Sequence, residues 1–140
     1  MSFVAFPLAA VLLILALVHV YWTVFGVGTG AAVPSHADGT PVIRPGRVAS
    51  LIVAVALLVG TLIVLARAHV LTVGVPSIMI RVGIWAMASA FAARTVGEFR
   101  YVGLFKRVRG TQFATWDTRF FTPLCAVIAT AAVVVVMTSE

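Results

Sequence analysis

One stretch of this chain gathers the residue types that acid–base chemistry needs. Between Gly97 and Arg107 the sequence GEFRYVGLFKR places an acid among cations and aromatic side chains. The whole chain has only three histidines and four acidic residues in 140 positions, so few other groups can move a proton. Such a role requires a carboxyl or imidazole that titrates near neutral pH, which partial burial can arrange. The candidates are His19, Glu98 and Asp117.

Cations and aromatic residues close to these three would complete a binding site. Arg94 and Arg100 can hold an anionic group such as a phosphate or a carboxylate. Trp22, Tyr101 and Phe113 can pack against an apolar body. These residue types favour a hydrophobic or anionic amphiphile as the ligand: a lipid, an isoprenoid or a quinone. They leave open whether the protein only binds it or also acts on it, for instance by isomerisation or cyclisation.

Each candidate also has a structural interpretation. His19 can bond a backbone carbonyl near a helix end, Glu98 can neutralise a neighbouring arginine, and Asp117 can cap the N-terminus of the following helix. Four cations can orient the chain or bind anionic lipid headgroups, each contributing about 1 kcal/mol: Arg100, Lys106, Arg107 and Arg109.

The other motifs are weak. GVGTGA after the first apolar segment resembles a dinucleotide glycine motif, but no strand–helix–strand pattern surrounds it. His36 and Asp38 are only two possible metal ligands, which is too few for a site. The single cysteine, Cys125, lies in an apolar run and excludes an internal disulfide. We therefore expect neither a metal nor a cofactor.

The composition predicts an integral membrane protein. Hydrophobic residues make up 62% of the chain, charged residues 10%, and the mean hydropathy is +1.15. Soluble domains carry about 25% charged residues, so this chain cannot cover a water-facing surface and the lipid bilayer is its expected solvent. The net charge of +6 does not indicate nucleic acid binding, because the cations flank apolar segments instead of forming a stripe.

The predicted fold is all-α, a bundle of four transmembrane helices in a single domain spanning residues 1–140. The expected helices are 4–25, 48–66, 76–96 and 120–138, each close to the roughly 20 residues that cross a bilayer. Two long loops, 26–47 and 97–119, join them, and the second is an amphipathic interfacial segment. Small residues at Gly60, Gly83 and Ala88 favour close helix packing.

The Lys/Arg bias predicts the orientation. Eight of the ten cations lie on the two long loops or beside them, while the opposite side has Arg67 and Arg81. The positive-inside rule places these loops in the cytoplasm and both termini outside. The same topology would bring together, at the cytoplasmic end of the bundle, the polar groups of distant segments: His19, Arg94, Glu98, Arg100 and Asp117.

Three segments resemble the bacterial DUF3995 membrane proteins: HVYW (19–22), RTVGEFRYVGLFKR (94–107) and TQFATWDTRFFTPLC (111–125). The stretch GVGTG (26–30) departs from the Gly-Gly pair of that family. The resemblance implies a bacterial inner-membrane protein and no reaction, because the family's function is unknown. The positions that match its pattern are His19, Trp22, Arg94, Gly97, Glu98, Arg100, Tyr101, Gly103, Phe113, Asp117, Pro123, Leu124 and Cys125.

Two other classes of function stay open. An accessory membrane subunit would use GEFRYVGLFKR to dock a partner protein or anionic lipid. A transporter is less favoured, because the centres of the first, second and fourth helices are almost wholly apolar, and a path through them would require a homo-oligomer.

Overall fold

The computed structural model describes residues 2–28 and 31–138, and its regular structure is helical apart from one isolated bridge between Ser35 and Pro41. The long helices are α1 (Ser2–Phe25), α2 (Arg47–Arg67) and α3 (Ser77–Val96). A fourth helical stretch runs unbroken through α4 (Gln112–Trp116), the π-helix η1 (Asp117–Phe121) and α5 (Thr122–Thr138). The predicted all-α class is confirmed.

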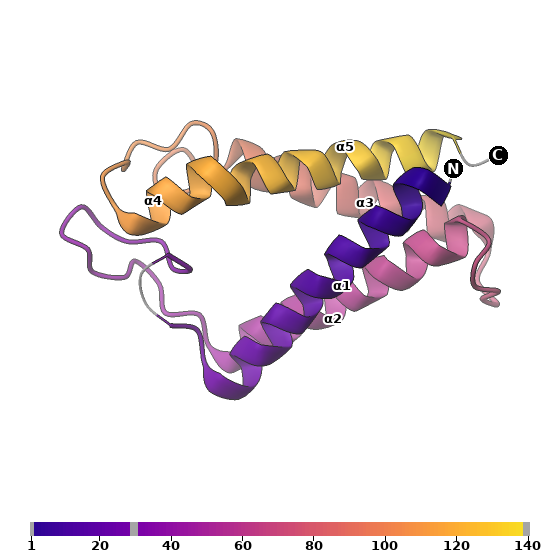
Figure 1. Cartoon of the computed structure of the whole chain (residues 1–140), viewed down its shortest axis with the longest axis horizontal. Helices are drawn as coiled ribbons and strands as arrows, with labels where there is room; N and C mark the ends of the chain where they lie inside the picture. The colour runs from indigo at the N-terminus through magenta and orange to yellow at the C-terminus, as the bar shows by residue number, and fades with distance from the viewer. Residues whose placement is uncertain (1, 29–30, 139–140) are drawn as a thin grey trace.

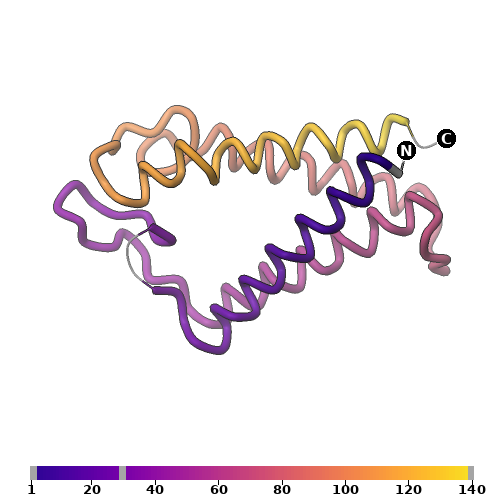
Figure 2. Tube along the Cα trace, in the orientation of Figure 1, coloured from indigo at the N-terminus to yellow at the C-terminus, as the bar shows by residue number. Residues whose placement is uncertain are grey.

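The helices form two antiparallel pairs, α1 with α2 and α3 with α5 (Figure 1). The pairs meet at the end where α1 begins and α5 ends. They diverge toward the other end, where α1 ends and α4 begins, as the Cα trace shows (Figure 2). Both long connections, 26–46 and 97–111, lie at the diverging end. Any site built from those loops is therefore formed where the two pairs are furthest apart.

The core joins the two pairs. Each long helix contributes one large, fully buried aliphatic side chain: Leu12, Val64, Ile84 and Ile128. Two glycines permit the close approach of α2 and α3, since a Cβ at Gly83 would lie 2.9 Å from the Ile63 side chain and one at Gly60 would lie 3.0 Å from the sulfur of Met87. Such small residues are typical of helix contacts in membranes.

Three helical segments are long and apolar enough to cross a membrane: Phe3–Phe25, Arg47–Arg67 and Gln112–Thr138. Their outward faces carry large exposed apolar side chains, such as Ile14, Ile52 and Val127. α3 has a similar length but includes Arg81 and Arg94, and it is not among these three. The part of the chain that the structure describes thus has three such spans.

The fourth helix begins earlier than the expected residue 120. Thr111 is its N-cap, and the Thr111 side chain accepts a hydrogen bond from the Ala114 amide at 3.1 Å. Asp117 therefore lies inside the helix, and its interpretation as an N-cap is wrong. The expected interfacial segment 97–119 is helical over its last part.

A π-turn precedes Pro123. The Thr122 amide donates to the carbonyl of Asp117, five residues back, instead of the usual four. Proline cannot donate a backbone hydrogen bond, and its ring collides with the carbonyl four residues earlier in an α-helix. Widening the helix just before Pro123 relieves that conflict. Single π-turns of this kind often occur at functional sites, and this one contains Asp117.

Candidate functional site

Asp117 is the centre of a buried ion cluster. Its side chain is fully buried, and its Oδ1 lies 2.7 Å from Nη2 of Arg94. Its Oδ2 accepts from Nζ of Lys106 at 3.0 Å and from the Gly103 amide at 2.9 Å. We call these four residues the Asp117 cluster. It holds two cations and one carboxylate, so its net charge is positive.

Two glycines shape the loop that carries Lys106 and Gly103 to Asp117. Gly97 ends α3 with φ +83°, and Gly103 has φ +89°, both in the region that disfavours side chains. The loop then folds back on α3, because the Leu104 amide donates to the carbonyl of Thr95 at 2.9 Å. A Cβ at Gly103 would lie 2.5 Å from the carbonyl oxygen of Val96. Only glycine allows this return of the chain.

Lys106 is 3% exposed, so it is not one of the surface cations that the sequence suggested. Its ammonium group also donates to the carbonyl of Gly103 at 3.0 Å, so it links the loop to α4–η1. Arg107, the next residue, is exposed. Two adjacent cations in the sequence therefore have different surroundings, and headgroup binding stays a prediction for Arg100, Arg107 and Arg109.

Glu98 caps its own turn. Its Oε1 accepts from the backbone amides of Arg100, Tyr101 and Val102. The side chain is exposed, and its described hydrogen bonds are all local. The carboxylate of Glu98 therefore shapes the loop. The buried carboxylate of Asp117 instead pairs with two cations.

The contacts described for His19 stay within α1. Nδ1 lies 2.7 Å from the carbonyl oxygen of Leu15, and the ring packs edge-on against Trp22 with centroids 4.8 Å apart. Because a carbonyl only accepts, Nδ1 carries a proton and Nε2 is the nitrogen that can take another. The C-terminal end of α1 diverges from α4 and η1 (Figure 1). The described contacts thus join Arg94 to Asp117 and place His19 in a separate cluster.

The remaining predicted ligand-binding residues occupy two further places. The Arg100 guanidinium lies over the Tyr101 ring at 5.2 Å, and the Tyr101 hydroxyl is 3.1 Å from Nδ1 of His36. Phe113 is buried and packs against Phe121 with ring centroids 6.1 Å apart.

His36 belongs to a small turn in the first long connection. The Val42 amide donates to the carbonyl of Pro34, and the His36 amide to that of Thr40, both at 2.8 Å. Hydrogen bonds from the hydroxyl and amide of Thr40 hold the pKa of Asp38 below its usual value. In the described residues no three His, Cys, Asp or Glu side chains gather as metal ligands would.

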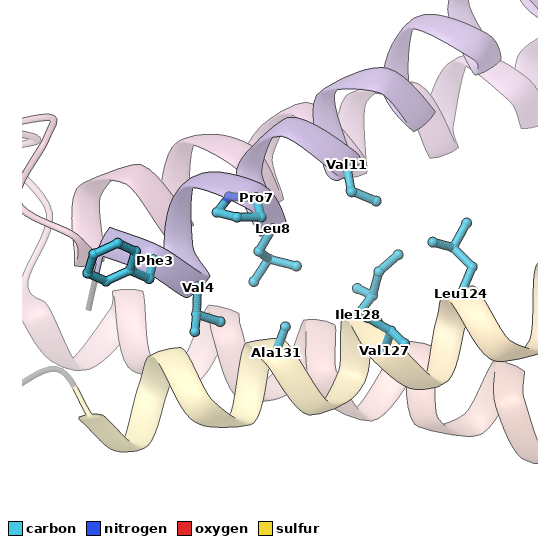
Figure 3. A pocket seen from close by; sticks show the side chains of 9 residues that line it. All are labelled: Phe3, Val4, Pro7, Leu8, Val11, Leu124, Val127, Ile128 and Ala131. Carbon is cyan, nitrogen blue, oxygen red and sulfur yellow. The ribbon is translucent and has the colours of Figure 1, made fainter.

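An apolar groove of about 220 Å³ lies between the first half of α1 and α5. In Figure 3 the side chains of Leu8 and Val11 on α1 lie opposite Leu124, Ile128 and Ala131 on α5. Leu124 is three residues beyond the end of η1, so one end of the groove approaches the helical segment that carries Asp117.

Sequence reasoning did not identify Lys106 as a partner of Asp117, nor His36 as a partner of Tyr101. Both contacts join residues whose approach depends on loop conformation. The glycine pair that brackets EFRYV is the one local signal that the loop folds back on itself, since isolated glycines mark turns.

These features define an all-helical protein with three segments suited to a membrane and a buried ion cluster beside its second long connection. A family model described as a protein of unknown function, DUF3995, matches residues 12–132. The chain belongs to this family, as its motifs indicated. The comparisons found no match among curated proteins or among solved structures.

Proposed function

We propose that this is an integral membrane protein that binds an amphiphile. Its polar head would lie at the Asp117 cluster and its apolar chain in the groove between α1 and α5. The observation that carries the proposal is the charge of the cluster: Arg94 and Lys106 face a single carboxylate, Asp117, in a chain otherwise poor in charge. A buried site with excess positive charge is complementary to an anionic group.

The membrane placement rests on helix length and charge. α3 has 20 residues, about 30 Å at 1.5 Å per residue, which matches the hydrocarbon core. Arg81 lies one turn from its start and Arg94 in its last turn, so neither charge needs to reach the bilayer centre. Together with its antiparallel partner α5, α3 completes four crossings, with the long loops in the cytoplasm and the termini outside, in a bacterial inner membrane.

The groove suits part of an apolar chain. Pockets that enclose a whole small ligand measure roughly 300–1,000 Å³, so a groove of about 220 Å³ takes only a segment of one. The remainder of the chain would lie in the bilayer. This arrangement favours lipid-like, isoprenoid or quinone ligands that enter sideways from the membrane.

The second long connection contributes a membrane anchor to this arrangement. Phe99, Leu104 and Phe105 are large, exposed apolar side chains in a loop that also carries the exposed cations Arg107 and Arg109. Apolar side chains beside cations are typical of segments that lie in the headgroup region. The anchor would hold the Asp117 cluster close to the headgroups from which an anionic ligand comes.

Binding is better supported than acid–base catalysis. The carboxylate of Asp117 already accepts from two cations and a backbone amide, which favours its ionised form as a structural anion. Glu98 is occupied by its own turn. Of the three catalytic candidates, His19 retains a ring nitrogen suited to take a proton, so any proton transfer would rest on it.

The test is mass spectrometry of the small molecules that the purified full-length protein retains from its host membrane. We expect an amphiphile with the wild type and a several-fold loss with Ala131→Phe, because the added ring occupies the groove. Val134→Phe, an exposed position on the same helix outside the groove, is the control and should retain the amphiphile.

Retention by Ala131→Phe equal to that of the wild type would contradict the groove as the chain-binding surface. A wild type that retains no amphiphile, and takes up none when lipid extract is added, would contradict the proposed function as a whole.

A further inference from the structure

Two buried hydrogen-bond donors beside the Asp117 cluster have no partner among the described residues. One is Nη1 of Arg94, whose Nη2 is bound to Asp117, and the other is the hydroxyl of Thr122, a residue only 2% exposed. Leaving a buried polar group unsatisfied costs roughly 1–3 kcal/mol. Such groups are rare in folded proteins and require an explanation, and a bound ligand is one.

The free hydroxyl of Thr122 is a consequence of the π-turn. Several other helical threonine hydroxyls donate to the carbonyl four residues earlier, as Thr61, Thr95 and Thr130 do at 2.8–2.9 Å. At Thr122 the preceding turn is a π-turn, in which its amide bonds the carbonyl of Asp117 five residues back. The carbonyls of that turn are displaced from their α-helical positions, and the usual acceptor for the hydroxyl is lost.

Both donors belong to residues that are hydrogen-bonded to Asp117. A π-turn closes after about five residues, so Thr122 stands one turn beyond Asp117 on the face that Arg94 contacts. The Thr122 side chain therefore lies one helical turn from the residue whose carboxylate Arg94 binds.

We propose that Nη1 of Arg94 and the hydroxyl of Thr122 together bind an anionic oxygen of the ligand, from a phosphate or carboxylate group. This inference rests on the proposed amphiphile binding and adds the class of its head group. Both groups donate, and a phosphate or carboxylate oxygen accepts from several donors at once. Arg94 supplies the charge that favours an anionic over a neutral head group, and Thr122 adds a hydrogen bond to the same oxygen.

The test uses the full-length protein in nanodiscs of neutral lipid, with dodecyl phosphate, dodecanol and inorganic phosphate as separate probes. Thr122→Val removes the hydroxyl at nearly constant shape, and Thr122→Ser retains it. We expect Thr122→Val to weaken dodecyl phosphate binding about tenfold, the effect of losing one hydrogen bond to a charged group. Thr122→Ser should bind nearly as the wild type does, and Thr122→Val should weaken dodecanol binding much less, because a hydrogen bond to a neutral oxygen contributes less than one to a charged oxygen.

Stability distinguishes this role from a structural one. Without ligand, Thr122→Val should unfold at the same temperature as the wild type or higher, because removing this hydroxyl leaves no hydrogen-bond partner unsatisfied. Thr61→Val is the matched control: Thr61 is also buried but bonds the carbonyl of Leu57, so its loss should lower the unfolding temperature and leave dodecyl phosphate binding unchanged.

The outcomes separate this inference from the proposed function. Full affinity of Thr122→Val for dodecyl phosphate, or a marked loss of stability in that variant, would overturn the inference alone. A wild type that binds neither dodecyl phosphate nor dodecanol would overturn the proposed function, and the inference with it. Inorganic phosphate that binds as tightly as dodecyl phosphate and is weakened by Thr122→Val would support the two-donor site and assign it to a soluble anion, against the amphiphile.

Discussion

At the scale of single residues, the buried carboxylate of Asp117 determines what its neighbours do. A charge removed from water is tolerated when it is paired and hydrogen-bonded, and the loss of one partner leaves the other uncompensated. Lys106 is the more deeply buried of its two cations, since the Arg94 side chain remains 33% exposed. Lys106 thus belongs to the interior of the protein despite lying in a run of basic residues.

Lys106→Met should lower the free energy of unfolding by about 3 kcal/mol, because Asp117 loses one of its two cations in a buried position. Thermal unfolding of the purified protein in detergent would measure the change. Arg107→Met removes an exposed cation one residue away and should alter stability little. Equal effects of the two substitutions would contradict the buried cluster.

At the scale of elements, the connection between α3 and α4 is held by its two glycines and by Glu98. The backbone of Gly103 approaches that of Gly97 so closely that a Cβ at Gly103 would lie 2.6 Å from the Gly97 amide nitrogen. The three amides bound by Glu98 fix the intervening turn. This connection is therefore an ordered element that positions Lys106 and the Gly103 amide against Asp117.

Gly103→Ala should destabilise the protein by about 2–4 kcal/mol, since the new Cβ adds a steric clash to a backbone conformation that side chains disfavour. Gly110→Ala is the matched control in the same connection, because a Cβ there meets nothing within 4 Å. Denaturation midpoints of the two variants in one detergent would compare them. If Gly103→Ala were as stable as Gly110→Ala, the loop would not fold back on α3 as described.

At the scale of the whole molecule, the two helix pairs share one apolar core at the end where α1 begins. At the diverging end, the described contact between His36 and Tyr101 joins the first long connection to the second. Five of the ten Lys and Arg residues lie in these connections, and Arg47 and Arg94 lie in the adjoining ends of α2 and α3. These cations and the two long connections thus lie at the same end of the molecule. The proposed topology places this end in the cytoplasm.

Cysteine labelling would test this topology in a Cys125→Ala background. Thr40 lies exposed in the first long connection, and Thr72 lies exposed in the short connection 68–76 between α2 and α3, at the opposite end. We expect Thr72→Cys to react with a membrane-impermeant maleimide in intact cells, and Thr40→Cys to react only after the membrane is opened. The reverse pattern would show that the protein is inserted the other way.

The sequence by itself determined the helical class and the family. In lipid, a long apolar segment can satisfy its own backbone hydrogen bonds only by forming a helix. The helices α1, α2 and α5 therefore follow from local composition. The motifs around His19, Arg94 and Asp117 indicated the family in the same local way. Asp117, Arg94 and the two loop glycines were also visible as residues of interest.

The tertiary structure decided which of these residues meet. Lys106 and Arg107 are adjacent cations, and only the backbone reversal at Gly97 and Gly103 brings one of them to Asp117. The π-turn that leaves the Thr122 hydroxyl without an acceptor depends on one extra residue per turn, which hydropathy does not register. Local composition sets where helices form, whereas the pairing of buried charges depends on the path of the chain between them.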